Sequence, residues 1–298
     1  MPIKYISHIP NTVEGQAILD NFVRTRRVLR YRDNDKVFDR VKRGLPLYEI
    51  EKIESIGNNP NNLVIRGECL SACAYLKDKG IKVDLVYIDP PFASGANYGK
   101  KILLRRHPHA QATALEGPAL EADGWEETLY GDIWNKEDYL NWMYENLTAI
   151  KAVMSDSASI YVHLDWHIGH YVKILLDEVF GEENFVNEIV WCYSGPTNQK
   201  NNFPRKHDTI YLYAKDKSDM FFDSDSIRVA YKKSNKSGGK TGLAGRSDEA
   251  SLEALDERGK IPEDWWPDIA DLGKVHSEDL GYPTQKPEAL LERILLRQ

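Results

Sequence analysis

The residues Asp89-Pro90-Pro91-Phe92 place a carboxylate, two prolines and an aromatic ring directly after a short apolar run, Val83 to Ile88. Proline has a fixed φ and no backbone N–H, so the carbonyls of Asp89 and Pro90 stay able to accept hydrogen bonds from a ligand. An exocyclic amine on a planar heterocycle could donate to both groups while its ring stacks on Phe92. The residues therefore predict chemistry on an aromatic amine; the plain alternative is a Pro-Pro turn that only ends a strand.

A buried parallel strand is expected to position this tetrapeptide. Residues 85–88 are rich in β-branched and aromatic types and are stopped by two prolines, as is typical of such a strand. Ligands in open α/β sheets bind at the carboxyl ends of the strands. The tetrapeptide therefore lies where a binding site is expected.

The surrounding sequence alternates short apolar runs with helical periodicity, which predicts an α/β fold with three layers. Residues 93–130 contain several glycines and prolines, so we expect a long mobile connection of the kind that often acts as a lid. The expected strands are residues 63–66, 85–88, 160–163, 189–191 and 206–213, and the expected helices are residues 70–77, 139–154 and 287–298.

Five segments together resemble the amino-group DNA methyltransferases. Asp89-Pro90-Pro91-Phe92 is similar to the catalytic motif of that family, in which Asp, Asn or Ser precedes Pro-Pro and an aromatic residue. The order of the segments, with the catalytic half first, resembles the beta class, which includes the modification subunits of type III restriction systems. The four later segments, which span most of the remaining chain, are Ser157 to His167, Asn184 to Trp191, Lys206 to Tyr213 and Tyr282 to Leu291.

The resemblance implies a three-layer Rossmann-like methyltransferase sandwich with an inserted target-recognition region. It implies transfer of a methyl group from S-adenosylmethionine to N6 of an adenine extruded from double-stranded DNA, without a metal. Aspartate at the first motif position suits adenine, and N4 of cytosine stays open as a substrate. The implied catalytic residues are Asp89, Pro90, Pro91 and Phe92, and the implied cofactor-binding residues are Thr284, Gln285, Lys286, Pro287, Gly67 and Glu68.

The same resemblance divides the chain into four parts. They are an N-terminal helical extension (1–58), a catalytic half (59–215), a target-recognition region (216–280) and the start of a cofactor-binding half (281–298). The glycine-rich turn that the family carries next, Asp-Pro-Phe-x-Gly-Ser-Gly or similar, does not occur before Gln298. We therefore expect a sandwich that is incomplete at its C-terminus, with the remaining strands absent or supplied by another chain. A catalytically silent DNA-binding fragment or specificity subunit stays open as the alternative.

Basic residues gather in one loop although the formal net charge is −7. The interval 228–246 is rich in glycine and serine and contains no acid, whereas residues 248–279 contain eleven acids. A basic loop within the expected target-recognition region predicts contact with DNA phosphates, and a solvated surface loop is the alternative. The six basic residues are Arg228, Lys232, Lys233, Lys236, Lys240 and Arg246.

Two other patterns suit different chemistry. His163, Asp165, His167 and His170 are metal-ligand types, but a strand end followed by a helix would separate them, and Asp165 better suits a helix cap. Residues 234–241 nearly match a phosphate-binding loop, but Ser234 replaces the first glycine and no buried strand precedes it. We expect neither a metal site nor an ATPase.

Composition indicates a reducing, aqueous environment. The 298 residues are 42% hydrophobic, enough for a substantial core, yet no apolar run is long enough to span a membrane and the N-terminus has no signal pattern. The cysteines, Cys69, Cys73 and Cys192, form no Cys-x-x-Cys pair, and none follows a proline as in the enzymes that methylate carbon 5 of cytosine. We expect a cytoplasmic protein with DNA as a partner and no membrane contact; the resemblance also allows a restriction endonuclease subunit or a second copy of the chain.

Overall fold

The computed structural model of the chain describes residues 44–48, 50–55, 62–93, 97–103, 124–131, 136–230, 258–275, 277–282 and 284–295. The chain divides into two compact units. The first comprises Met1–Lys82 and Asn135–Val153, and the second comprises Val83–Trp134 and Met154–Gln298. This division does not coincide with the predicted boundaries at residues 58, 215 and 280, which stay predictions. In the part of the chain described, no helix is long and apolar enough to cross a membrane.

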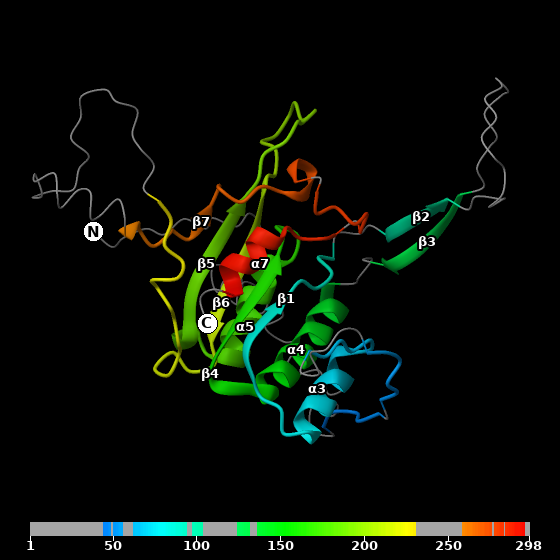
Figure 1. Cartoon of the computed structure of the whole chain (residues 1–298), viewed down its shortest axis with the longest axis vertical. Helices are drawn as coiled ribbons and strands as arrows, with labels where there is room; N and C mark the ends of the chain where they lie inside the picture. The colour runs from blue at the N-terminus through cyan, green and yellow to red at the C-terminus, as the bar shows by residue number, and fades with distance from the viewer. Residues whose placement is uncertain are drawn as a thin grey trace, which may run out of the picture. The chain divides into compact units, whose positions relative to one another are not determined.

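Two helices form the described core of the first unit. Helix α3 (Cys69–Asp78) packs against helix α4 (Lys136–Val153), as Figure 1 shows. Helix α4 buries Tyr139, Met143, Leu147 and Ile150, which recur every three or four residues and so share one face. The predicted helices at 70–77 and 139–154 are confirmed.

The predicted strand at residues 63–66 is wrong. Residues 62–66 have no regular structure, and the Val64 side chain is 97% exposed. A short apolar run forms a strand only if a partner strand pairs with it and buries it, which local composition cannot reveal. Residues 44–48 and 50–55 of the expected N-terminal helical extension likewise contain no helix, and residues 1–43 lie outside the described residues.

A mixed five-stranded sheet forms the centre of the second unit. Its strand order is β1-β4-β6-β5-β7; β1 and β4 are parallel, β6 is antiparallel to both of its neighbours, and β5 and β7 are parallel. The chain is therefore an α/β protein, and the predicted strands from residue 85 onward are confirmed. The strands are β1 (Val83–Ile88), β4 (Met154–Leu164), β5 (Phe185–Cys192), β6 (His207–Ala214) and β7 (Trp265–Trp266).

Strand direction brings three separate segments to one edge of this sheet. Because β1 and β4 are parallel, their carboxyl ends lie at the same edge, and β6, antiparallel to β4, begins there. Strand β5 is antiparallel to β6 and so ends there as well. The residues after β1, the residues after β4 and the β5–β6 loop therefore share this edge.

Two helices cover opposite faces of the sheet, as alternate residues of β6 show. Ile210 and Leu212 belong to the core cluster that contains Leu290 and Ile294 of helix α7 (Glu288–Leu295). Tyr213 instead donates a hydrogen bond to Asp177 of helix α5 (Gly169–Phe180) at 2.5 Å. Successive strand residues point to opposite faces, so α5 and α7 lie on different sides. The predicted C-terminal helix is confirmed as α7. The described elements also include two short 3₁₀ helices, η2 (Glu182–Asn184) and η3 (Leu272–Lys274).

The predicted mobile connection at residues 93–130 contains a second, two-stranded sheet. Strand β2 (Asn97–Leu103) pairs antiparallel with β3 (Gly124–Gly131), and Lys100 stands opposite Glu127 in the register. The long connection thus contains paired strands that were not predicted, while its mobility and its role as a lid stay predictions. Pairing across a separation of about twenty residues leaves no local periodicity that single-sequence analysis could detect.

Removal of a buried side chain from α7 tests its packing on the sheet. Leu290→Ala should lower the free energy of unfolding by about 2–5 kcal/mol, because Leu290 is fully buried in the cluster. Leu295→Ala in the same helix is the matched control, since Leu295 is 61% exposed, and should change stability by no more than about 0.5 kcal/mol. Urea unfolding measures both; equal losses would contradict the described packing.

Candidate functional site

The carboxylate of Asp89 lies directly after β1 and forms an ion pair with Lys286, which precedes α7. Lys286 Nζ is 2.6 Å from Asp89 Oδ2, and the two side chains are 11% and 25% exposed. The same ammonium donates to the Thr284 carbonyl at 3.2 Å and lies 5.3 Å from the centroid of the Phe92 ring. One cation therefore contacts the carboxylate, the aromatic ring and its own loop.

Two acceptors of the tetrapeptide have no hydrogen bond to another described residue. Among the hydrogen bonds between described residues, none ends on the Pro90 carbonyl or on Asp89 Oδ1. Ala93, directly after Phe92, has a φ of 53°, in the left-handed region that costs an L-residue about 1–2 kcal/mol. The tetrapeptide thus presents a carboxylate, a carbonyl and an aromatic ring directly after the strand.

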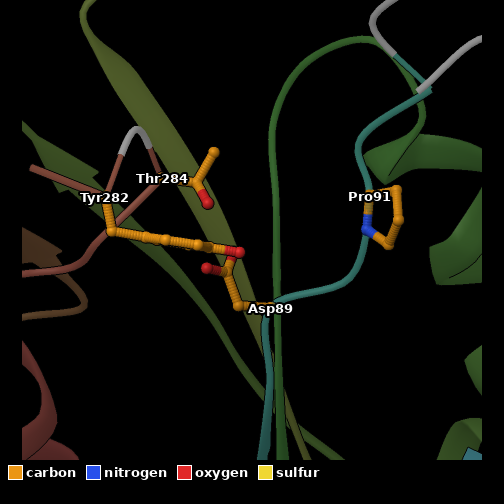
Figure 2. A pocket seen from close by; sticks show the side chains of 4 residues that line it. All are labelled: Asp89, Pro91, Tyr282 and Thr284. Carbon is orange, nitrogen blue, oxygen red and sulfur yellow. The ribbon is translucent and has the colours of Figure 1, made fainter. Parts of the chain in front are cut away.

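A pocket of about 280 Å³ opens beside the carboxylate, lined by Asp89, Pro91, Tyr282 and Thr284. In Figure 2 the Tyr282 side chain is directed at the Asp89 carboxylate, and the Thr284 hydroxyl faces the same space. The volume is close to the lower end of the range of about 300–1,000 Å³ that is usual for small-molecule sites. The pocket can therefore hold a planar group next to a hydrogen-bond acceptor.

A buried polar network lies next to Phe92. His163 is fully buried; its Nδ1 is 2.8 Å from the Tyr87 hydroxyl, and its Nε2 is 3.1 Å from Asp208 Oδ2. The Tyr193 hydroxyl donates to Asp208 Oδ1 at 3.1 Å. If His163 carries its proton on Nε2 and accepts at Nδ1, every polar group of the network has a hydrogen-bond partner. The Tyr87 and Tyr193 hydroxyls then donate, and the Asp208 carboxylate accepts two hydrogen bonds.

The environment keeps both tyrosines of this network protonated. Burial raises the pKa of Tyr87, and the charges of Asp89 and Asp208 raise it further. Burial likewise raises the pKa of Tyr193, with Asp208 as the next cause. Both hydroxyls therefore remain donors at neutral pH.

The network also supports the aromatic residue of the tetrapeptide. The His163 ring lies 6.0 Å from the Phe92 ring and 5.7 Å, edge to face, from the Trp191 ring, measured between centroids. Sequence reasoning considered His163 only as a metal ligand and missed Asp208 and Tyr193 as its partners. Only the strand register reveals these partners. Asp208 stands opposite Trp191 and His163 stands opposite Ile210, so Asp208 and His163 lie on the same face of the sheet.

The four metal-ligand types between His163 and His170 do not converge. Within the described residues, no group of three or more His, Cys, Asp or Glu side chains could hold a metal ion. Asp165 accepts hydrogen bonds from the backbone N–H and the imidazole of His167 at 2.9 and 2.5 Å, while Ile168 occupies the N-cap of α5 without a side-chain bond. The expectation that Asp165 caps this helix was wrong, because the carboxylate bonds His167 in the turn before it.

Only some of the residues expected on the cofactor side lie at the pocket or contact Asp89. Thr284 lines the pocket and Lys286 contacts Asp89, as described above. The Gln285 amide instead bonds the Leu280 N–H at 3.0 Å and the Glu278 carbonyl at 2.7 Å, so it closes its own loop. Pro287 is buried directly before α7.

Gly67 and Glu68 belong to the first compact unit, whereas the residues around Asp89 belong to the second. Glu68 is the N-cap residue of α3 but makes no side-chain cap bond there. A Cβ on Gly67 would meet no atom within 4 Å. Their expected contact with a cofactor stays a prediction.

Arg228 forms hydrogen bonds to other residues of the chain. Its guanidinium donates to Asp225 at 2.8 Å and to the Gly259 carbonyl at 3.1 Å, and it lowers the pKa of the Asp225 carboxyl. These bonds give Arg228 a structural role. The other predicted DNA-binding residues, and residues 234–241 of the near phosphate-binding loop, lie outside the described residues; the former are Lys232, Lys233, Lys236, Lys240 and Arg246.

The family model and the related proteins that match this chain are named for DNA methylation or restriction-modification. Residues 83–297 match the N6/N4 family described as DNA methylase. The chain is 26% identical over 238 residues to the EcoPI Mod subunit of a type III restriction-modification enzyme from Escherichia phage P1, covering 78% of this chain and 36% of that protein. It is 23% identical over 239 residues to the DNA adenine methyltransferase YhdJ of Escherichia coli, covering 80% and 67%.

Among solved structures, the M1.HpyAVI–SAM complex matches with a TM-score of 0.40 and 14% identity, over 78% of this chain and 74% of that one. The chain spans less than half the length of several curated relatives that it matches. The family therefore rests on the sequence match across the tetrapeptide, the sheet and α7.

Replacement of Asp208 tests the buried network. Asp208→Asn removes an acceptor for the Nε2–H of His163 or for the Tyr193 hydroxyl, so the free energy of unfolding should fall by about 1–3 kcal/mol. Asp219→Asn makes the same substitution at an exposed carboxylate and should change the free energy of unfolding by less than about 0.5 kcal/mol. Chemical denaturation compares the two variants, and a network of no energetic consequence would leave them indistinguishable.

Proposed function

We propose that this chain, which belongs to the N6/N4 DNA methylase family, transfers a methyl group from S-adenosylmethionine to the exocyclic N6 amine of adenine in DNA. The observation that carries the proposal is the ion-paired Asp89 carboxylate at the end of β1, with the Pro90 carbonyl and the Phe92 ring beside it. Asp89, Pro90, Pro91 and Phe92 are the proposed catalytic residues.

The proposed reaction begins with extrusion of the adenine, because its amine is otherwise held inside the duplex. Phe92 then stacks on the ring, while Asp89 Oδ1 and the Pro90 carbonyl accept the two amine hydrogens. The nitrogen lone pair is delocalised into the ring, so these acceptors favour the tetrahedral nitrogen that can bond the incoming methyl carbon. Transfer of the methyl group from the cofactor sulfur to this nitrogen would release one proton, which the Asp89 carboxylate is placed to accept. No covalent enzyme intermediate is required.

S-adenosylmethionine would supply a methyl group bonded to a positively charged sulfur, and the conversion of that sulfonium to a neutral thioether favours the transfer. The Tyr282 ring and the Thr284 hydroxyl at the pocket are the kinds of group that hold a nucleoside, so the described residues fit this cofactor. The proposed cofactor side is Thr284, Gln285, Lys286 and Pro287, with Gly67 and Glu68 as further candidates.

Two observations favour adenine over N4 of cytosine. The first motif position is Asp89, which suits adenine in the resembling enzymes, and YhdJ, which the chain covers for 67% of its length, is named an adenine methyltransferase. Transfer to cytosine N4 is the second candidate, since the family includes both amines.

We extend the proposal to architecture and partners. The helices α5 and α7 on opposite faces of the sheet support the three-layer Rossmann-like methyltransferase sandwich, with residues 216–280 as an inserted target-recognition region. The partner is double-stranded DNA, and the similarity to EcoPI Mod supports a restriction-modification setting with an endonuclease subunit or a second copy of the chain. The cytoplasmic location stays a prediction.

Substitution of Asp89 tests the catalytic assignment. Asp89→Asn keeps the shape but replaces one acceptor oxygen by a donor, so the rate of methyl transfer from labelled S-adenosylmethionine to unmethylated DNA should fall about 100- to 1,000-fold. The control is Asp84→Asn within β1, the strand that Asp89 follows, because the Asp84 carboxylate is not part of the pocket and accepts a hydrogen bond from Ser155 Oγ at 2.6 Å. This control should keep the wild-type rate, and an Asp89→Asn rate equal to it would refute the assignment.

A second substitution separates two roles for Lys286. If the ammonium orients Asp89, Lys286→Gln should lower the turnover rate about 10- to 100-fold while the Kd for S-adenosylmethionine stays unchanged. Arg293→Gln, which breaks the neighbouring ion pair with Asp268, is the control and should leave turnover intact. A Kd for the cofactor that rises with turnover unchanged would instead place Lys286 on the cofactor side alone.

A further inference from the structure

The loop between β5 and β6 is long, basic and free of acids. It spans fourteen residues, 193–206, from the end of β5 at Cys192 to the start of β6 at His207. Its charged residues are Lys200, Arg205 and Lys206, so it carries three positive charges in a chain whose formal net charge is −7. A connection of this length between paired strands commonly serves a function rather than simple chain reversal.

The base of the loop is closed while its tip is exposed. The Tyr193 N–H bonds the Lys206 carbonyl at 3.0 Å, which extends the β5–β6 pairing by one step. Beyond this bond, residues 194–205 are exposed, and the Phe203 side chain is 93% exposed. Lys274 of the 3₁₀ helix η3 donates to Ser194 Oγ and adds a fourth cation next to the loop.

Arg205 is held in a defined orientation by an aromatic stack. Its guanidinium carbon lies 3.8 Å from the centroid of the Trp166 ring, and that ring lies 3.8 Å from the His167 ring at an angle of 31°. His167 is fixed in turn by two hydrogen bonds to Asp165. Trp166 is 45% exposed, so the stack stands on the surface.

The guanidinium has no acidic partner among the described residues. None of the ion pairs between them involves Arg205. A guanidinium held over an indole ring can still donate its N–H groups to two oxygens of a phosphate. Because the stack already orders the side chain, little rotamer freedom is lost on binding.

The stack and the loop lie at the edge of the sheet that carries Asp89. Trp166 follows β4, Arg205 precedes β6, and Asp89 follows β1, and strand direction brings these three positions to one edge. Figure 1 shows the β5–β6 loop extending beyond the strands at this edge. A polyanion bound there would lie next to the pocket.

We propose that Arg205, ordered by Trp166, and the basic β5–β6 loop bind the phosphodiester backbone of DNA next to the extruded base. This inference rests on the proposed function, since it places the DNA substrate of the Asp89 site. It assigns backbone contact to a surface other than residues 228–246, of which the described Arg228 already forms hydrogen bonds to other residues of the chain. Phosphate contacts position the duplex and carry no sequence information by themselves.

The test measures the affinity of the full chain for a mixed-sequence DNA duplex at several salt concentrations. Each phosphate contact contributes about 0.9 to the slope of log K against log salt concentration, so Arg205→Gln should reduce that slope by about 1 and weaken binding roughly three- to tenfold at moderate salt. Trp166→Ala keeps the charge but removes the support of the guanidinium, and should weaken binding about two- to fivefold.

Lys217→Gln is the charge-matched control. Lys217 follows β6, at the opposite edge of the sheet, and donates to the Phe185 carbonyl there. Its variant should keep the wild-type slope and affinity. Thermal unfolding of all variants establishes that each is folded at the temperature of the measurement.

The outcomes separate this inference from the function on which it rests. A wild-type chain that binds no DNA overturns both. A wild-type chain that binds DNA, with Arg205→Gln retaining the wild-type slope or losing no more than Lys217→Gln, overturns the docking surface alone. A loss confined to Arg205→Gln and Trp166→Ala supports it.

Discussion

The ion pair between Lys286 and Asp89 joins positions 197 residues apart and holds the carboxylate on which the proposed chemistry depends. Two prolines follow Asp89, so the adjacent backbone offers no N–H groups that could fix the carboxylate. An ammonium that is 11% exposed is screened less by salt than a surface charge, and it leaves Asp89 Oδ1 without a partner among the described residues. Asp89 is thus oriented through one oxygen and can accept a hydrogen bond through the other.

The hydrogen-bond network around His163 connects the sheet to the tetrapeptide. Buried polar groups destabilise a fold unless their hydrogen bonds are satisfied, and here a single assignment of protons satisfies Tyr87, His163, Asp208 and Tyr193 together. Tyr87 is two residues before Asp89 on β1, and His163 lies against Phe92. The network therefore connects three strands of the sheet to the tetrapeptide and restricts how far the tetrapeptide can move.

Local sequence predicted the parts of this molecule that depend on neighbouring residues. The apolar run before Asp89, the periodicity of α4 and the pattern of α7 each identify an element, and Pro90 and Pro91 identify the turn. Contacts between distant residues were not predictable in the same way. The β2–β3 pairing, the bond between His163 and Asp208, and the stack of Arg205 on Trp166 depend on strand register and order, which a single sequence does not contain. Lys286 was assigned to the cofactor side because its segment resembles one there, whereas its contact with Asp89 required the fold.

The central claim is that the Asp89 pocket receives the amine of adenine. Mass analysis of nucleosides from unmethylated plasmid DNA, after incubation with the chain and S-adenosylmethionine, tests this claim most directly. The account predicts N6-methyladenine as the product. Methylation at carbon 5 of cytosine would contradict the amine chemistry altogether, and N4-methylcytosine as the only product would contradict the choice of adenine.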